Sequence, residues 1–130
     1  MLSITSKSPY ALSALVELHH QSAACPVPIA ELARRREIPV QFLEQLFATL
    51  RRAGILRSQR GVKGGYSLAR PADSITVLEL VELLDGPLGA AATGVFATAA
   101  QAAATILGEA TVASVADEEI RAAAAPMYYI

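Results

Sequence analysis

The sequence predicts a mainly α-helical domain with one small β-hairpin, followed by a long helix and a C-terminal tail. Apolar residues recur at helical spacing through the first half, a glycine-rich turn then separates two alternating segments, and alanine dominates residues 89–110. The chain has 130 residues, of which 53% are hydrophobic and 18% charged. It is therefore long enough for one compact core and is not expected to be disordered.

Three helices are predicted in the first half of the chain. The first spans residues 8–21, and the second begins at Pro28, whose missing N–H costs nothing at a helix start. The third spans residues 40–53, places its large apolar residues on one face, and ends at Gly54 as a left-handed cap. Two short helices with a tight connection, the second ending in two arginines, form a helix-turn-helix pattern.

A β-hairpin is predicted directly after the third helix. Residues 55–60 and 66–69 alternate between apolar and polar side chains on either side of a glycine-rich turn at residues 61–65. A hairpin in this position is the wing of a winged helix. Its glycines permit positive φ angles and allow backbone N–H groups to approach a phosphate closely.

The rest of the chain is predicted to contain a capped helix, a long alanine-rich helix and a short last helix. Thr76 and Glu79 form a capping box at the start of the first of these. The small side chains of the second, over residues 94–107, suit close packing against another helix. We interpret it as a dimerisation helix, with a core helix of the monomer as the alternative. The predicted division is a winged helix-turn-helix domain over residues 1–87 and a dimerisation helix with a tail over residues 88–130.

Positive charge is concentrated in the segment that holds the predicted helix-turn-helix and wing. The formal net charge of the chain is −1, but residues 34–70 carry nine positive and two negative side chains, which gives this segment a net charge of +7. Such asymmetry favours an anionic partner. The alternative is a basic face that is simply solvated.

The single cysteine and the short length of the apolar stretches indicate the cellular compartment of the protein. Cys25 has no second cysteine in the chain, which excludes an intrachain disulfide framework and fits a reducing cytoplasm. No stretch approaches the roughly 20 apolar residues of a membrane span. The first residues also lack the apolar core of a secretion signal. We therefore expect a cytoplasmic protein that has no membrane partner.

Three segments of the sequence resemble a family of bacterial winged-helix regulators. Residues Thr5–Ala11, Phe42–Phe47 and Arg60–Tyr66 look like motifs of the IscR/NsrR/CymR (Rrf-type) family. The resemblance covers roughly residues 1–87 in order and spacing, and the last third in plan only. It implies a homodimer crossed by a long helix, bound to double-stranded DNA at a near-palindromic operator.

The resemblance also implies which residues contact DNA. The positions of Phe42, Glu44 and Gln45 face the major groove in the family, and Gln41 lies beside them. Arg60, which opens the wing motif, would enter the minor groove. The chemistry agrees, because glutamine pairs with adenine, a carboxylate accepts from cytosine, and arginine suits a narrow minor groove. An internal salt bridge is the alternative for Glu44. The other predicted contacts are phosphate-binding residues and a wing glycine: Lys7, Arg51, Arg52, Gly61 and Lys63.

Many members of this family bind an iron–sulfur cluster through three cysteines between the fourth helix and the dimer helix. Residues 86–108 contain no cysteine, histidine, aspartate or glutamate, so the sequence excludes a cluster there, and we predict no cofactor. Cys25 is either a redox-sensing thiol or an ordinary loop residue. His19 and His20, at a helix end, are interpreted as partners of the helix dipole rather than metal ligands.

The apolar C-terminus resembles that of cluster-free, CymR-like repressors, which act with cysteine synthase. The resemblance implies that the tail Tyr128, Tyr129 and Ile130 binds that enzyme, with the carboxylate and side chain of Ile130 held in its active-site pocket. Packing of the tyrosines on a helix of the neighbouring subunit is the alternative. We thus predict a transcriptional repressor of cysteine metabolism or redox response. The alternative is a winged-helix protein-interaction module. An enzyme is not expected, because no nucleophile, base and carboxylate set is visible.

Overall fold

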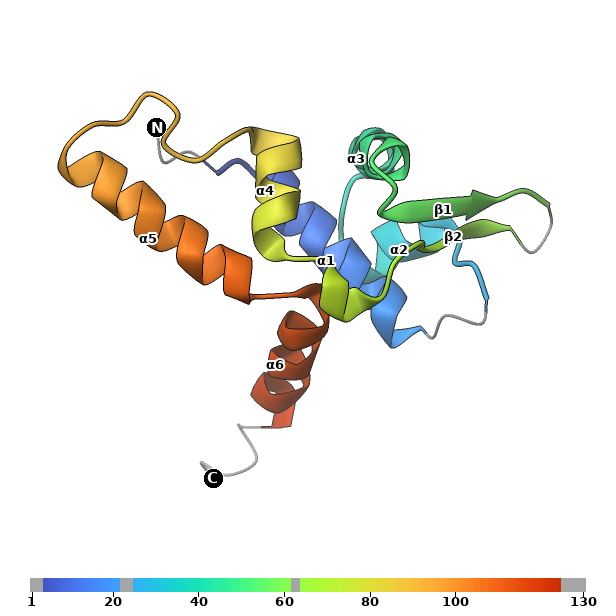
Figure 1. The fold of residues 1–130 in the computed structure, drawn as a ribbon. Helices are drawn as coiled ribbons and strands as arrows, with labels where there is room; N and C mark the ends of the chain where they lie inside the picture. Colours follow the sequence, from blue (N-terminus) through green and yellow to red (C-terminus); the bar gives the residue numbers. More distant parts are fainter. Residues whose placement is uncertain (1–3, 22–24, 62–63, 125–130) are drawn as a thin grey trace.

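The computed structural model describes residues 4–21, 25–61 and 64–124, and these form a helical domain with one antiparallel hairpin (Figure 1). The predicted fold class is confirmed. In chain order the elements are α1 (Lys7–His20), α2 (Ile29–Arg36), α3 (Val40–Arg52), β1 (Leu56–Gln59), β2 (Gly65–Leu68), the 3₁₀ turn η1 (Ala72–Ser74), α4 (Val77–Asp85), α5 (Val95–Glu109) and α6 (Val112–Ala124).

Helix α1 lies at the centre of the core, where it contacts α2, α3, α4, α6 and β2. Its small residues Ala11 and Ala14 are fully buried, which lets the surrounding helices approach closely. Helix α3 buries Leu43, Phe47 and Leu50, spaced four and three residues apart on one face. The opposite face of α3 is consequently directed to solvent.

The wing is a short hairpin that is tied to the chain before α2. Strand β1 pairs with β2, and Tyr66 exchanges two backbone hydrogen bonds with Val27, each 2.9 Å long. A Cβ atom at Gly65, where φ is +152°, would lie 2.4 Å from the Val27 carbonyl, and one at Gly64 would lie 2.3 Å from the Gln59 oxygen. The fold itself thus requires both glycines, in addition to any contact they make with a phosphate.

Helix α4 begins with the predicted cap. The Thr76 hydroxyl accepts a hydrogen bond of 3.1 Å from the backbone N–H of Glu79. The reciprocal half of a capping box is replaced, because the Glu79 carboxylate pairs with the guanidinium of Arg70. The helix ends at Asp85, and Gly86 follows with a positive φ of 88°.

Removing this cap is expected to destabilise the fold. Thr76→Ala should lower the free energy of unfolding by about 1 kcal/mol, because the Glu79 N–H loses its acceptor at the helix start. Urea unfolding measures this change. Thr98→Ala is the matched control, since that hydroxyl bonds only to the exposed backbone of its own helix, and it should stay within about 0.5 kcal/mol of the wild type. Equal losses in the two variants would contradict the role of the cap.

The last two helices leave the core and return to it. Helix α5 projects away from the winged helix and packs mainly against α4 (Figure 1). Ala100 is the only buried residue of this helix. Since Val95 and Ile106 are exposed, α5 is not a core helix of this monomer. Helix α6 packs against α1 and η1, and buries Val112 and Ala116 in the same core. The predicted unit 88–130 thus contains a helix that packs with the winged helix. In the described part of the chain, no helix is long and apolar enough to cross a bilayer.

Candidate nucleic-acid interface

The solvent-facing side of α3 carries three of the four predicted readout residues. Gln41, Glu44 and Gln45 are exposed, and their spacing of three and four residues places them on one side of the helix. Glu44 forms no ion pair within the described residues. The salt bridge considered as an alternative is therefore not found there, and the carboxylate faces outward.

Phe42 occupies a different environment from these polar residues. Its ring is half-buried and packs edge-on against Tyr10, with the ring centroids 5.6 Å apart and the planes at 87°. Only the remaining part of the ring borders the exposed face. The predicted contact of Phe42 with the major groove stays a prediction, and the structure gives this residue a second role in positioning α3 on α1.

Lys7 is held at the start of α1 by contacts between that helix and the end of α4. The Ser8 hydroxyl donates to the Asp85 carboxylate at 2.6 Å, and Thr5 donates to it through its hydroxyl and its backbone N–H. Burial tends to raise the pKa of Asp85, but the hydrogen bonds from Ser8 and Thr5 outweigh it, so the pKa lies below its ordinary value. Lys7 itself is exposed and forms no ion pair within the described residues.

The basic residues of segment 34–70 fall into two groups. Arg34, Arg35, Arg36 and Arg70 form ion pairs with carboxylates of the same chain. Four others are exposed and have no ion-pair partner in the described parts of the chain: Arg51, Arg52, Arg57 and Arg60. The net charge of +7 therefore overstates the free positive charge, which is restricted to the end of α3 and to the wing. Helical spacing accounts for the pairs that Arg34 and Arg35 form with Glu31 inside α2. It does not reveal the pairs with Glu17, Glu119 and Glu79, because these acids lie on α1, α6 and α4.

Some of the remaining predicted residues belong to the described part of the chain, and others lie outside it. Gly61 is exposed at the wing turn with a φ of 116°, and Cys25 is exposed in the loop before α2. His20 does more than face the helix dipole, since its Nε2 lies 3.4 Å from the Glu119 carboxylate of α6. In the described residues no three His, Cys, Asp or Glu side chains gather as a metal site. Lys63 and the tail residues Tyr128, Tyr129 and Ile130 lie outside the described residues.

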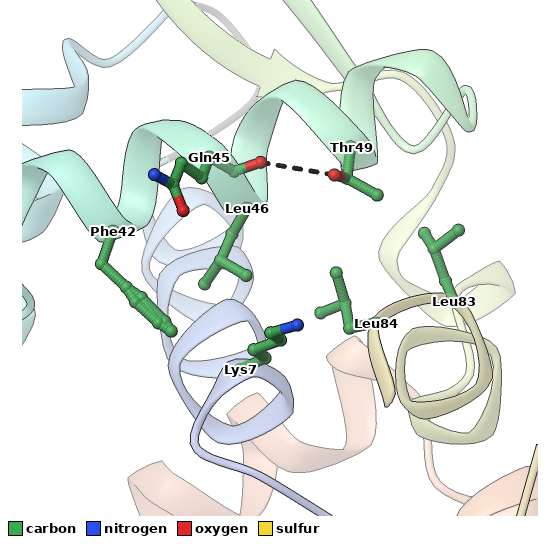
Figure 2. Close-up of a pocket in the computed structure, with 7 residues that line it drawn as sticks. All are labelled: Lys7, Phe42, Gln45, Leu46, Thr49, Leu83 and Leu84. Carbon is green, nitrogen blue, oxygen red and sulfur yellow. Dashed lines mark hydrogen bonds between the residues drawn. The ribbon is translucent and has the colours of Figure 1, made fainter. Parts of the chain in front are cut away.

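A pocket that the sequence did not reveal lies between α1, α3 and α4 and has a volume of about 300 Å³ (Figure 2). Its α4 wall comes from a helix more than 30 residues away along the chain, so no local pattern signals it. The lining combines three predicted DNA contacts with four other side chains: Lys7, Phe42, Gln45, Leu46, Thr49, Leu83 and Leu84.

Known proteins resemble this chain in sequence. The Rrf2 family, described as an iron-dependent transcriptional regulator, matches residues 4–118. The transcriptional regulator IscR of Cereibacter sphaeroides is 43% identical over 95 residues, which cover 72% of this chain and 61% of that protein. IscR of Escherichia coli strain K12 is 43% identical over 82 residues, covering 63% of this chain and 51% of that protein. The chain thus matches between about half and three fifths of the length of these relatives.

Solved structures resemble it in fold over most of its length. CymR (YrzC), the global cysteine regulator of B. subtilis, superposes with a TM-score of 0.83 at 28% identity, covering 91% of this chain and 98% of that one. IscR of T. potens gives a TM-score of 0.80 at 30% identity, covering 91% of this chain and 88% of that one. With the family match over residues 4–118, these likenesses show that the chain belongs to the Rrf2 family of transcriptional regulators.

Proposed function

We propose that the chain is a sequence-specific repressor that binds a near-palindromic DNA operator as a cytoplasmic homodimer. The observation that carries this proposal is the exposed polar face of α3, which lies next to four arginines without ion-pair partners in the described residues. A helix with such a face can enter a major groove, and the free arginines can hold the phosphates on either side.

Each predicted contact has a role in this arrangement. Gln45 would pair with adenine, and Glu44, which has no internal salt bridge in the described residues, would accept from a cytosine amino group. Arg60 would probe the minor groove from the wing. Lys7, Arg51, Arg52 and Lys63 would bind phosphates and so fix the register of the protein on DNA.

Helix α5 is the proposed dimer contact. Val95, Ala99, Ala102 and Ile106 are exposed and follow a spacing of four, three and four residues, which places them in one line along the helix. The alanines permit a second helix to approach closely. An apolar cleft of about 220 Å³ lies beside α5 and has Leu107 in its wall. Together the line of residues and the cleft offer a second copy more apolar surface than a lone helix would.

The residues present do not fit an iron–sulfur cluster, although the family is described as iron-dependent. A cluster needs several thiolate or other metal-binding side chains, and residues 86–108 supply none. We therefore propose that this chain regulates without a cluster in that region. By analogy with the global cysteine regulator of B. subtilis, we place its signal in cysteine metabolism or redox response. The cysteine synthase partner stays a prediction, because it rests on tail residues outside the described ones.

Footprinting on genomic fragments, the promoter of its own gene included, tests the proposed function. Binding should protect a site with two similar half-sites and weaken steeply with salt, because each phosphate contact releases counterions. Binding that does not respond to salt, or no binding to any fragment, would contradict the proposal. The second result would favour the alternative of a protein-interaction module.

Gln45→Ala should lower the affinity of the dimer for its operator by at least about thirtyfold, because one bidentate base contact is lost in each half-site and each contact is worth about 1–3 kcal/mol. It should also relax the preference for adenine at one position of each half-site. Titration against operators that vary at single positions measures both effects. Gln101→Ala is the matched control, since this glutamine is exposed on α5 and not on the face of α3 that is proposed to bind DNA. An unchanged base preference would exclude Gln45 from readout.

Arg60→Ala should weaken binding to a similar extent, with the largest loss at operators whose A·T-rich flanks narrow the minor groove. Competition between A·T-rich and G·C-rich flanks measures this difference. Arg34→Ala removes the same charge from α2, where Arg34 lies 3.8 Å from Glu31, and should change affinity much less. If the two variants bind equally well to both flanks, the wing contact is refuted.

A further inference from the structure

The pocket between α1, α3 and α4 combines one cation with a largely apolar wall. Among the described residues, Lys7 is the only charged one that lines it, and Figure 2 shows its side chain extending beneath α3 toward Leu84. Leu46 points into the same space from α3, and Leu83 faces it from α4. A volume of about 300 Å³ is sufficient for a small organic molecule.

The polar groups of the pocket have unused hydrogen-bonding capacity. Asp85 accepts hydrogen bonds from Thr5 and Ser8. The charge of Lys7 helps to lower the pKa of Asp85, but the two side chains form no ion pair. The Thr49 hydroxyl donates to the Gln45 carbonyl and accepts from the Arg52 guanidinium, and both hydrogen bonds are long, at 3.4 Å. The ammonium group is thus available to an anion, and the hydroxyl can turn toward a second oxygen.

We propose that this pocket binds a small organic carboxylate with an aliphatic or aromatic body, and that its occupation weakens operator binding. The carboxylate pairs with Lys7, while the body packs against Leu46, Leu83 and Leu84. An inorganic anion would leave the apolar wall unused, and a neutral apolar molecule would leave the lysine without a partner. Both parts of the lining therefore point to an amphipathic anion.

The proposal rests on the proposed function, because its effect on DNA follows from shared residues. Lys7 and Gln45 line the pocket and are also proposed DNA contacts. A bound carboxylate takes up the charge of Lys7 and adds a negative charge beside the phosphates. The bound carboxylate also lies between α3 and α4, so α3 must accommodate it. Both effects disfavour the DNA-bound state.

Titration of the full chain with 3-phenylpropionate, followed by ¹H–¹⁵N resonance shifts, tests the binding step without DNA. Saturable shifts are expected at the amides of Leu46, Thr49 and Leu84. The neutral 3-phenylpropanamide should bind about tenfold more weakly, because it lacks the charge that pairs with Lys7. Inorganic phosphate should not saturate these shifts. Equal binding of acid and amide, saturation by phosphate, or shifts confined to another surface would overturn the proposal.

Two tryptophan variants on α4 distinguish binding of the acid in the pocket from effects that any tryptophan on this helix would have. Leu83→Trp fills the pocket from an exposed position and should abolish the shifts, whereas Glu82→Trp, at the exposed neighbouring position outside the lining, should keep them. The acid should lower operator affinity about fivefold in the wild type and in Glu82→Trp, but not in Leu83→Trp. An equal effect in all three proteins would overturn the proposal. Absence of operator binding altogether would count against the proposed function and leave the resonance test of the pocket intact.

Discussion

Ile106→Asp is expected to convert the protein to a monomer and to lower its affinity for a two-half-site operator by at least about a hundredfold. The Ile106 side chain is 66% exposed although it is large and apolar, and it continues the line that begins at Val95. An aspartate there places one charge from each copy in an apolar contact, where neither has a partner. Each remaining monomer then binds a single half-site and loses the gain from simultaneous engagement.

Sedimentation of the free protein and titration of the operator measure the two effects. Gln101→Asp is the matched control, because it adds the same charge to the polar side of α5 and should remain dimeric. Val95→Asp, at a side chain that is 72% exposed at the other end of the same line, should reproduce the loss. Since these residues are exposed in the monomer, thermal unfolding of the variants should stay cooperative. A dimeric Ile106→Asp protein would place the contact between copies on another surface.

Helix α3 and its surroundings were predictable because their signals are local. The apolar residues of α3 repeat at helical spacing, and those predicted for one face, Leu43, Leu46, Phe47 and Leu50, are all buried. The glycine-rich turn predicted the hairpin for the same reason, and Thr76 marks the start of α4 through its own side chain. Such patterns need no knowledge of the rest of the chain.

Features that depend on distant segments were not predictable. Val27 lies between two prolines, in a segment that the sequence presents only as a break between helices. Its backbone nevertheless pairs with Tyr66 at the wing. Helix α6 buries Val112 in the core, and the Val112 N–H donates to the Ile75 carbonyl, a contact that no periodicity indicates. The wall of the pocket arises in the same way from Leu83 on α4. Each of these three contacts joins segments that are far apart in the sequence and meet only in the folded chain.

Charge provides the sharpest contrast between sequence and structure. The three consecutive arginines of α2 suggest a basic face, but Arg36 donates to Glu17 at 2.9 Å and to both oxygens of Glu119, at 2.8 and 2.9 Å. Glu119 also lies 3.4 Å from His20. The cluster joins α1, α2 and α6, so it fastens the first helix of the helix-turn-helix to the last helix of the described chain.

Arg36→Ala is therefore expected to lower stability rather than to remove a DNA contact. The Arg36 side chain is only 16% exposed. Its loss leaves Glu119 with His20 at 3.4 Å, whereas Glu17 keeps Gln21 and Arg35. Because Glu119 is 44% exposed, solvent moderates the cost, and we expect about 2 kcal/mol in the free energy of unfolding. Arg34→Ala is the control, since Arg34 is 72% exposed and should change stability by less than about 0.5 kcal/mol.

The pH dependence of this loss identifies its cause. The hydrogen bond from Arg36 holds the pKa of Glu119 below its ordinary value despite some desolvation. A depressed carboxyl pKa contributes stability that is complete above the unfolded value, about 4.3, and disappears as the pH falls through the lower folded value. The stability difference between wild type and Arg36→Ala should thus be largest near neutral pH and shrink in acid. In urea unfolding at both ends of this range, Glu119→Gln should remove most of the pH dependence. A difference that is constant with pH would assign the loss to the packing of the Arg36 side chain instead.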